Sequence, residues 1–189
     1  MNCAGVAHYM PLTELPADKA RELLGVKVLA TRAAVIGMVE RGHGAVINVA
    51  GMIAFSGPAP HAQMPRRAVY AGALAHLVAM SQTLSAEREG TGVQIEVLCP
   101  GVVATEFHQR QGIDLSAVPR MSADDVVNAG LRGLALGEVV CAPGVEDVSL
   151  LDTVSQADLA AFGAQSIELA SRYRSACPTQ PRLVRQPPA

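Results

Sequence analysis

The stretch from Gly44 to Leu74, GAVINVAGMIAFSGPAPHAQMPRRAVYAGAL, decides the fold. It begins with a short apolar run rich in β-branched residues, 45–49, which is bounded by glycines. Such a run is typical of a strand that is buried on both faces of a parallel sheet. From Arg66 onward, apolar residues recur at helical spacing as far as the glycines at 90 and 92. The stretch therefore predicts a central strand, a long loop and a helix that carries Tyr70 in its first turn.

The sequence on either side completes a parallel sheet. A helix is expected over 17–40, before the central strand, and a second strand is expected at 93–99. Because a helix joins the two strands, the connection is a right-handed crossover and the strands are parallel. A capping box at Ser122 opens another helix that ends near Leu136. A third parallel strand is expected at 138–141.

Four short motifs follow one another along the chain. They are Asn2-Cys3-Ala4-Gly5, the strand 44–51, Tyr70, and the loop Pro100-Gly101-Val102-Val103-Ala104-Thr105. In this order and spacing they resemble the N-N-A-G turn, the G-x-I-x-N-V-S-S strand, the catalytic tyrosine and the P-G-x-x-x-T cofactor loop of the short-chain dehydrogenase/reductase family. The resemblance covers nearly the whole chain, to about Gly144.

This resemblance implies an α/β fold with a Rossmann-like, doubly wound parallel sheet. The chain would hold only its C-terminal part, three parallel strands with flanking helices. Members of the family are NAD(P)-dependent oxidoreductases that transfer hydride between the nicotinamide and a carbonyl or alcohol substrate. The resemblance makes Tyr70 the general acid or base, and it assigns contacts with NAD or NADP to Asn2, Ala4, Gly5, Tyr70, Pro100, Gly101, Val102 and Thr105. No metal ligands are expected.

Two positions near Tyr70 depart from the family pattern. The family places a lysine one helical turn after the tyrosine, where it stabilises the phenolate and holds the ribose, but this chain has Leu74. The family's serine pair falls on Ala50 and Gly51, which have no hydroxyl. Ser56 either replaces this serine as the ligand of the substrate carbonyl or is a solvated turn residue.

Candidate cations lie elsewhere in the sequence. Where the family keeps an asparagine for a proton relay, one alignment places Lys27 and another places Leu23. Lys27 is either a displaced functional cation or a lysine that extends its ammonium to the surface. Arg66 and Arg67 either replace the missing lysine electrostatically or form an exposed pair where the helix begins.

The family's T-G-x-x-x-G-x-G phosphate loop is not found in this sequence, so we expect the adenine half of the cofactor site to be missing. Three hypotheses therefore stay open. The chain is an oxidoreductase, a catalytically inactive relative that serves as a binding or oligomerisation module, or a truncated reading frame without independent activity.

Composition points to one intracellular domain. The chain has 189 residues, of which 50% are hydrophobic, and a net charge of -2. The near-neutral balance gives no reason to expect nucleic acid or an anionic membrane as partner. We expect a domain over 1–174, whose last helix covers 152–174, and a disordered proline-rich tail over 175–189. The spacing of the four cysteines and the lack of a secretory signal favour a reduced, cytoplasmic location.

The predicted central strand has a free edge, which favours pairing with another chain. In the family, the helices that correspond to 17–40 and 66–89 form the dimer interface. We therefore expect a homo-oligomer through these two helices, with a small carbonyl or alcohol as the other partner.

Overall fold

The structure is a computed structural model that describes residues 1–59 and 66–174. These residues belong to two compact units, the first from Met1 to Glu146 and the second beginning at Asp147. Each unit is described by itself. The expected tail at 175–189 and part of the loop before Tyr70 lie outside the described residues.

The first unit alternates helices and strands, as the sequence predicts. In chain order its elements are a 3-10 turn at Leu12–Glu14, α1 (Ala17–Arg41), β1 (Gly44–Val49), a 3-10 turn at Met52–Phe55, α2 (Ala68–Glu87), β2 (Val93–Leu98), α3 (Phe107–Arg110), α4 (Ala123–Leu136) and β3 (Val140–Cys141). The second unit contains α5 (Ser149–Gly163) and a 3-10 turn at Ser171–Tyr173.

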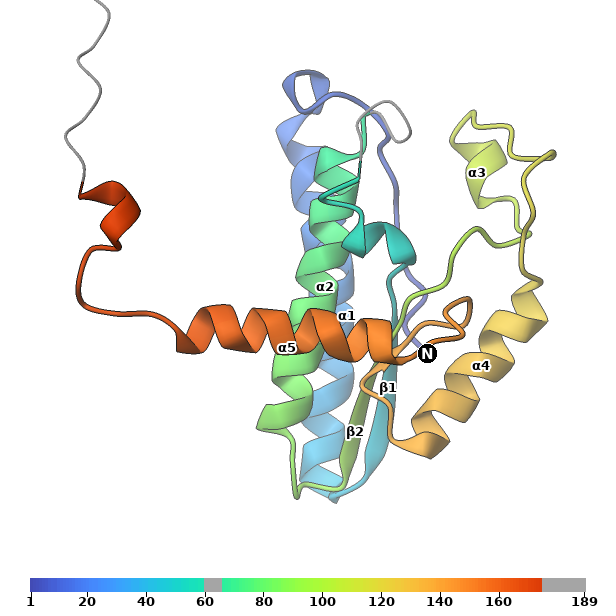
Figure 1. The fold of residues 1–189 in the computed structure, drawn as a ribbon. Coiled ribbons are helices and arrows are strands. Elements are labelled where there is room, and N and C mark those ends of the chain that lie inside the picture. The colour runs from blue at the N-terminus through green and yellow to red at the C-terminus, as the bar shows by residue number, and fades with distance from the viewer. Residues whose placement is uncertain (60–65, 175–189) are drawn as a thin grey trace, which may run out of the picture. The chain divides into compact units, whose positions relative to one another are not determined.

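The three strands form one parallel sheet in the order β1-β2-β3 (Figure 1). Gly44 pairs with Val93 at one end of the β1–β2 ladder and Val49 pairs with Leu98 at the other. The predicted α/β fold with a parallel, Rossmann-like sheet is confirmed. All three strands end at the same edge of the sheet, so the loops that follow them lie close together.

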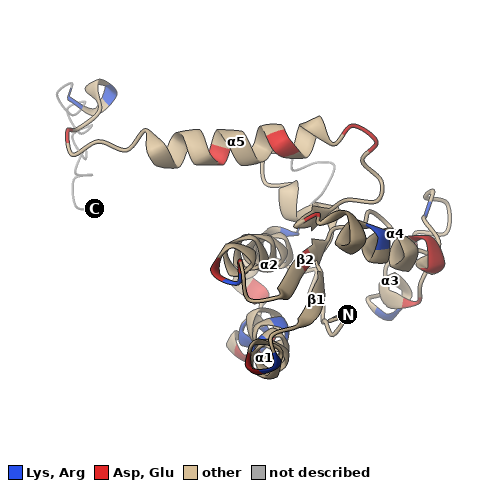
Figure 2. Cartoon of the chain, turned by 90° about the horizontal axis from the view of Figure 1, so that it is seen from below, with Lys and Arg blue, Asp and Glu red and all other residues tan. Residues whose placement is uncertain are grey.

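Helices cover both faces of the sheet. Figure 2 shows α1 and α2 side by side on one face and α4 on the other. The side chains of β2 alternate accordingly. Ile95, Val97 and Cys99 point toward α1 and α2, whereas Glu96 and Leu98 point toward α4. This alternation explains why the strand sequences are apolar on nearly every residue.

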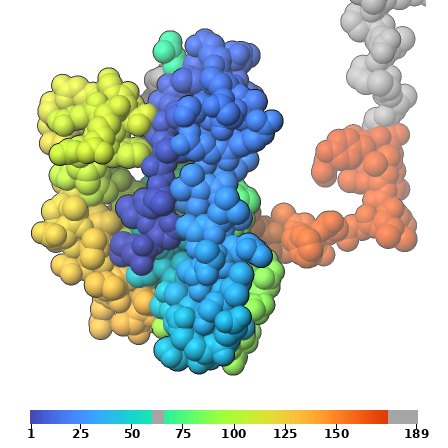
Figure 3. Space-filling model, turned by 180° about the vertical axis from the view of Figure 1, so that it is seen from behind, coloured from blue at the N-terminus to red at the C-terminus, as the bar shows by residue number. Residues whose placement is uncertain are grey.

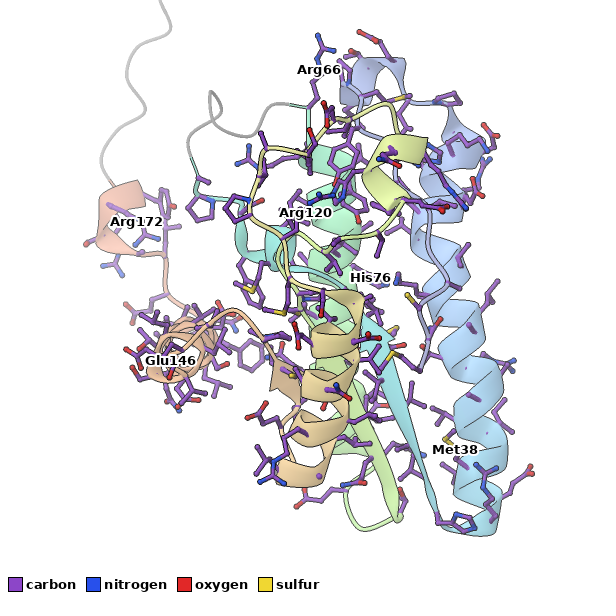
Figure 4. All side chains as sticks on the ribbon, turned by 90° about the vertical axis from the view of Figure 1, so that its right-hand side faces the viewer. Met38, Arg66, His76, Arg120, Glu146 and Arg172 are labelled. Carbon is purple, nitrogen blue, oxygen red and sulfur yellow. The ribbon has the colours of Figure 1, made fainter. Side chains whose placement is uncertain are left out.

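The turn from α1 into β1 depends on two glycines. Gly42 ends α1 as its C-cap in the left-handed conformation, with a φ of 73°. Gly44 then packs against Met38, which Figure 4 labels beside this turn. A Cβ atom at Gly44 would lie 2.6 Å from Met38 Cγ, so any larger residue would push this side chain out of the core.

The third strand is shorter than predicted. It covers Val140–Cys141 and not 138–141, because Glu138 takes part in the cap that follows α4. Gly137 adopts the left-handed conformation and the amide of Glu138 donates to Gly133 O at 3.0 Å. This pair of features is a Schellman cap, which ends α4 and engages the first residue of the predicted strand.

The last predicted helix, 152–174, is also wrong in its extent. The observed helix α5 covers Ser149–Gly163, and residues 164–170 are not helical. Ile167 and Leu169, which suggested helical spacing, are exposed. Without a packing partner, their periodicity does not hold the backbone in a helix.

Cys99 and Cys141 are buried in the core with free thiols. Burial raises the pKa of both thiols to about 12, which makes them poor nucleophiles. Within residues 1–59 and 66–174, none of the helices has the length and apolar character that crossing a membrane requires.

Candidate functional site

A cleft of about 710 Å³ opens at the carboxyl edge of the sheet in the first unit. Its walls come from the N-terminal segment, from α1 and α2, from the loop after β2 and from the segment around α3. Figure 3 shows the opening from behind, between the yellow-green segment around α3 and the dark-blue N-terminal residues. Open parallel sheets bind their ligands at this edge.

Tyr70 lines this cleft from the first turn of α2, as the sequence predicts. Its ring stacks against that of Tyr9, with centroids 4.9 Å apart and planes tilted by 56°. The centroid of the Phe107 ring lies 6.5 Å from that of Tyr70. The tyrosine is therefore held between the N-terminal segment and α3.

The surroundings of Tyr70 keep its hydroxyl protonated. Burial raises the pKa of Tyr70 well above its usual range, and the Tyr9 hydroxyl, which shares a hydrogen bond with it, raises that pKa further. Burial also raises the pKa of Tyr9. At neutral pH, the Tyr70 hydroxyl therefore keeps its proton.

Leu74 occupies the position one turn after Tyr70 and is 4% exposed. Its side chain fills the space beside the end of β1, where a Cβ atom at Gly51 would lie 3.6 Å from Leu74 Cδ1. This position therefore adds an apolar wall to the cleft and no charge.

Ser56 also lines the cleft, but its hydroxyl is already engaged. It donates to Ile53 O at 2.7 Å and accepts from Arg67 Nε at 3.0 Å. To bind a substrate carbonyl, this hydroxyl would have to give up its bond to Ile53. Its role as a carbonyl ligand stays a prediction.

The two arginines before Tyr70 differ in their exposure and in their hydrogen bonds. Arg66 is exposed and has a positive φ of 57°. Arg67 is half-buried, lines the cleft and donates through Nη2 to the carbonyls of Ser56 and Ala59 at 2.7 and 2.9 Å. The predicted exposed pair is wrong for Arg67, because these hydrogen bonds hold it against residues 56–59.

The loop after β2 lies where the family resemblance expects the cofactor. Pro100 O accepts from the Met52 amide at 2.8 Å, so the loop is bound to the segment after β1. Thr105 is exposed, lines the cleft and accepts a weak hydrogen bond from the Phe107 amide at 3.4 Å. Gly101 and Val102 line the cleft between these two residues.

Two further backbone hydrogen bonds join the loop after β2 to Met121. The Met121 amide donates to Val102 O at 3.0 Å, and the Ala104 amide donates to Met121 O at 2.9 Å. On the intervening segment, burial and the nearby Arg120, labelled in Figure 4, lower the pKa of His108.

The N-terminal turn stabilises the sheet, as the resemblance implies. The Asn2 amide donates to Ile47 O at 2.7 Å, and the Val49 amide donates to Asn2 O at 3.1 Å. The Asn2 side chain donates to Asn48 Oδ1 at 3.0 Å. Of the residues predicted to contact the cofactor here, Gly5 lines the cleft, whereas Asn2 and Ala4 are not among its lining residues.

Asn48, which is fully buried, is the centre of a polar network that the sequence does not single out. Its Oδ1 also accepts from Thr31 Oγ1 at 2.7 Å, and its Nδ2 donates to Ser81 Oγ at 3.1 Å. The network joins the N-terminal turn, α1, α2 and β1. It fixes the end of β1 against the helix that carries Tyr70.

Lys27 reaches the cleft from α1. Its ammonium donates to Val49 O, the last carbonyl of β1. Gly5 lies beside this side chain, since a Cβ atom there would be in van der Waals contact with Lys27 Cε, at 3.4 Å. Burial lowers the pKa of Lys27, as expected for a cation with limited access to water.

Comparison with protein-family models gives a match to the model described as short chain dehydrogenase, over residues 1–115. An inactive 2-(S)-hydroxypropyl-CoM dehydrogenase 2 of Xanthobacter autotrophicus is 30% identical over 127 residues, which are 65% of this chain and 53% of that protein. A 1-deoxy-11-beta-hydroxypentalenate dehydrogenase of Streptomyces exfoliatus is 38% identical over 138 residues, 67% of this chain and 46% of that protein. The chain spans about half the length of these curated relatives.

Solved structures give the same result for the fold. A short-chain dehydrogenase from Sphingobium yanoikuyae in complex with NADPH superimposes with a TM-score of 0.79 and 25% identity. The match covers 91% of this chain and 67% of that one. A bulky-bulky ketone specific alcohol dehydrogenase from Comamonas testosteroni, 21% identical, has the same fold, with a TM-score of 0.73. This match covers 90% of this chain and 65% of that one.

Proposed function

Because the chain belongs to the short-chain dehydrogenase family, we propose that it is an NAD(P)-dependent oxidoreductase that acts on a carbonyl or alcohol substrate. One observation carries this proposal. Tyr70, Thr105 and the Pro100-Gly101 turn, which are far apart in the sequence, line one cleft at the carboxyl edge of the sheet.

Tyr70 is the residue that moves a proton in this proposal. It donates its hydroxyl proton to the carbonyl oxygen during reduction and takes it back during oxidation. Since burial and Tyr9 hold the pKa of Tyr70 high, the protonated donor is ready at neutral pH. The protonated hydroxyl is the form that carbonyl reduction requires, and its high pKa makes it a weak acid.

The residues of the cleft fit a nicotinamide nucleotide. Lys27 and Arg67 bring positive charge to the cleft, and none of the described residues that line it is Asp or Glu. Bound NADH or NADPH would supply the hydride. Thr105 and the backbone of residues 100–102 would hold the nicotinamide carboxamide and a nearby phosphate.

The substrate side of the cleft is apolar. Phe107, Ile113 and Leu115, all on the segment that follows the cofactor loop, line this part. We infer that the substrate is a carbonyl compound or alcohol with an apolar body, because few polar partners are available there.

Leu74 and the engaged hydroxyl of Ser56 favour a second candidate function. In it, the cleft binds a nucleotide or an apolar ligand and does not turn it over. The ligand would then couple to assembly or to a partner protein, and Tyr70 would be a binding residue only.

An assay of NADPH and NADH oxidation with a panel of apolar ketones and aldehydes distinguishes the oxidoreductase from the binding module that does not turn its ligand over. The oxidoreductase proposal predicts turnover by the full chain that falls at least a hundredfold in Tyr70→Phe, the usual scale of a lost general acid. The matched control is Tyr173→Phe, whose side chain is exposed in the second unit. Saturable nucleotide binding without turnover by either protein would support the binding module.

We also propose that the chain forms a homo-oligomer through α1 and α2. Leu29 and Ile36 lie on the same side of α1, seven residues apart, and are 67% and 46% exposed. Sedimentation velocity should show a dimer or larger species, and Leu29→Glu should dissociate it. Leu136→Glu, at an equally exposed leucine of α4, should not. A monomer in all three samples at micromolar concentration would refute this proposal.

The proposed location is the cytoplasm. Cys3, Cys99 and Cys141 are free thiols, which is the usual state of cysteine in a reducing compartment.

A further inference from the structure

Lys27 is an ammonium group with unused hydrogen-bonding capacity inside the cleft. An ammonium group has three N–H donors. One of them serves Val49 O. Within residues 1–59 and 66–174, no carboxylate lies within ion-pair distance of Lys27. The side chain is half-buried, so it loses part of its hydration without gaining an ionic partner.

The other cation of the cleft is held differently. Arg67 donates to two backbone carbonyls and to the Ser56 hydroxyl, so its guanidinium is bound to the wall. Lys27 is held more loosely, since the structure gives its ammonium one hydrogen bond, to Val49 O. Because Lys27 is one of the residues that line the cleft, its remaining N–H donors are available to a ligand bound there.

The charge of the surrounding wall points to the kind of ligand. None of the described lining residues is acidic, so the cleft itself cannot neutralise the ammonium. A half-buried cation that has no carboxylate partner among the described residues is stabilised most by an anion that binds next to it.

We propose that the Lys27 ammonium binds an anionic oxygen of the molecule that occupies the cleft. This oxygen belongs to a phosphate or a carboxylate group, and either group would accept a charge-assisted N–H···O bond from Lys27. The assignment of its source rests on the proposed function: the phosphate belongs to the nicotinamide nucleotide, or the carboxylate belongs to the substrate. The anion binds about where β1 ends, beside Gly5 and Val49.

The chain offers a direct test because it contains only two lysines, Lys19 and Lys27. Lys19 is paired with Glu22 at 3.0 Å on the surface of α1 and serves as the internal reference. With lysine labelled with ¹³C at Cε, the full chain gives two resolved signals. We expect pyrophosphate or hexanoate to shift the Lys27 signal in a saturable way and to leave the Lys19 signal in place.

The source of the anion is found by comparing two probes that differ by one phosphate, reduced nicotinamide mononucleotide and reduced nicotinamide riboside. If the phosphate is the ligand, the mononucleotide binds the wild-type chain at least tenfold more tightly than the riboside, the scale of one charged hydrogen bond. That difference disappears in Lys27→Met and persists in Lys27→Arg and Lys19→Met. If only hexanoate shifts Lys27, the anion is a substrate carboxylate.

Two results would overturn the assignment of Lys27. One is that none of these anions moves the Lys27 signal of the wild-type chain, a measurement that needs no variant to fold. The other is that both NADH and hexanoate bind wild type and Lys27→Met equally well, which would leave the proposed oxidoreductase function intact. A chain that binds hexanoate at Lys27 but neither NADH nor NADPH would instead refute the oxidoreductase proposal and support this one.

Discussion

The rings of Tyr9 and Tyr70 lie 4.9 Å apart and their hydroxyls share a hydrogen bond, although 61 residues separate them in the chain. Tyr9 belongs to the N-terminal segment and Tyr70 to the first turn of α2. The contact does two things. It closes one side of the cleft, and it keeps the proton on the hydroxyl that we propose to be catalytic.

The first prediction concerns this pair. Tyr9→Phe removes the hydrogen bond but keeps the stacked ring, so the pKa of Tyr70 should fall. The fall should be partial, because burial is the larger cause of the raised pKa. Tyrosinate absorbance measured against pH reports this change, with Tyr173 as the exposed reference in the same chain. A Tyr70 titration that does not move in Tyr9→Phe would show that the hydrogen bond has no effect.

The second prediction concerns the residue one turn after Tyr70. Leu74→Lys places an ammonium on the same helix face as the tyrosine, four residues away, and should lower the pKa of Tyr70. Because Leu74 is 4% exposed, the same change should reduce the free energy of unfolding by roughly 2–4 kcal/mol. Leu74→Met is the control and should neither lower the pKa of Tyr70 nor reduce the free energy of unfolding by this amount. An unchanged Tyr70 titration in a folded Leu74→Lys variant would mean that position 74 does not face the tyrosine hydroxyl.

Local sequence pattern predicted most of the fold. The apolar run at β1, the periodicity of α2 and the helical crossover together predicted a parallel sheet. The capping box was also correct, since Ser122 Oγ accepts from the Asp125 amide at 3.0 Å. These features depend on neighbours in the chain, which a sequence displays directly.

The features that the sequence predicted wrongly or did not reveal depend on contacts between residues that are far apart in the chain. Tyr9 showed no pattern, and its role arises only because the N-terminal segment folds back onto α2. Arg67 was expected at the surface, but the carbonyls of residues 56 and 59 turn it inward. The sequence left the role of Lys27 undecided, and its bond to Val49 O depends on how α1 packs on β1.

The third prediction concerns the buried network around Asn48. Asn48→Ala leaves Thr31, Ser81 and the Asn2 side chain without their shared partner. The free energy of unfolding should fall by roughly 2–4 kcal/mol. Ser81→Ala, which removes one hydrogen bond of the network, should cost about 1 kcal/mol. Chemical denaturation of both variants shows which one loses more free energy of unfolding. A larger loss in Ser81→Ala than in Asn48→Ala would contradict the central role of Asn48.

The fourth prediction concerns Glu96, which is fully buried and faces Gly130 and Gly133 of α4. Within the described residues, neither carboxylate oxygen has a hydrogen-bond partner. Burial, and to a smaller extent the charge of Glu138, raise the pKa of Glu96 from 4.5 to about 7. As pH rises between these two values, the unfolded chain loses this proton first, so the folded state binds more protons and the free energy of unfolding falls.

Glu96→Gln should remove this dependence on pH. At pH 8 it should unfold with a free energy roughly 1–3 kcal/mol higher than that of the wild-type chain, because no charge is buried, and the two should converge near pH 5. Glu87→Gln, at an exposed glutamate of α2, is the control and should leave the pH dependence unchanged. Equal pH dependence in wild type and Glu96→Gln would show that Glu96 does not titrate in this range.

The most direct test of the proposed oxidoreductase function is a calorimetric titration of the full 189-residue chain with NADH and, separately, with NADPH. The account predicts saturable binding of one of them near micromolar strength, about -8 kcal/mol. It also predicts weaker binding when Thr105, on the cofactor loop, is changed to Val. A folded chain that binds neither nucleotide would contradict the proposal, and the cleft beside Tyr70 would then have to serve a different ligand.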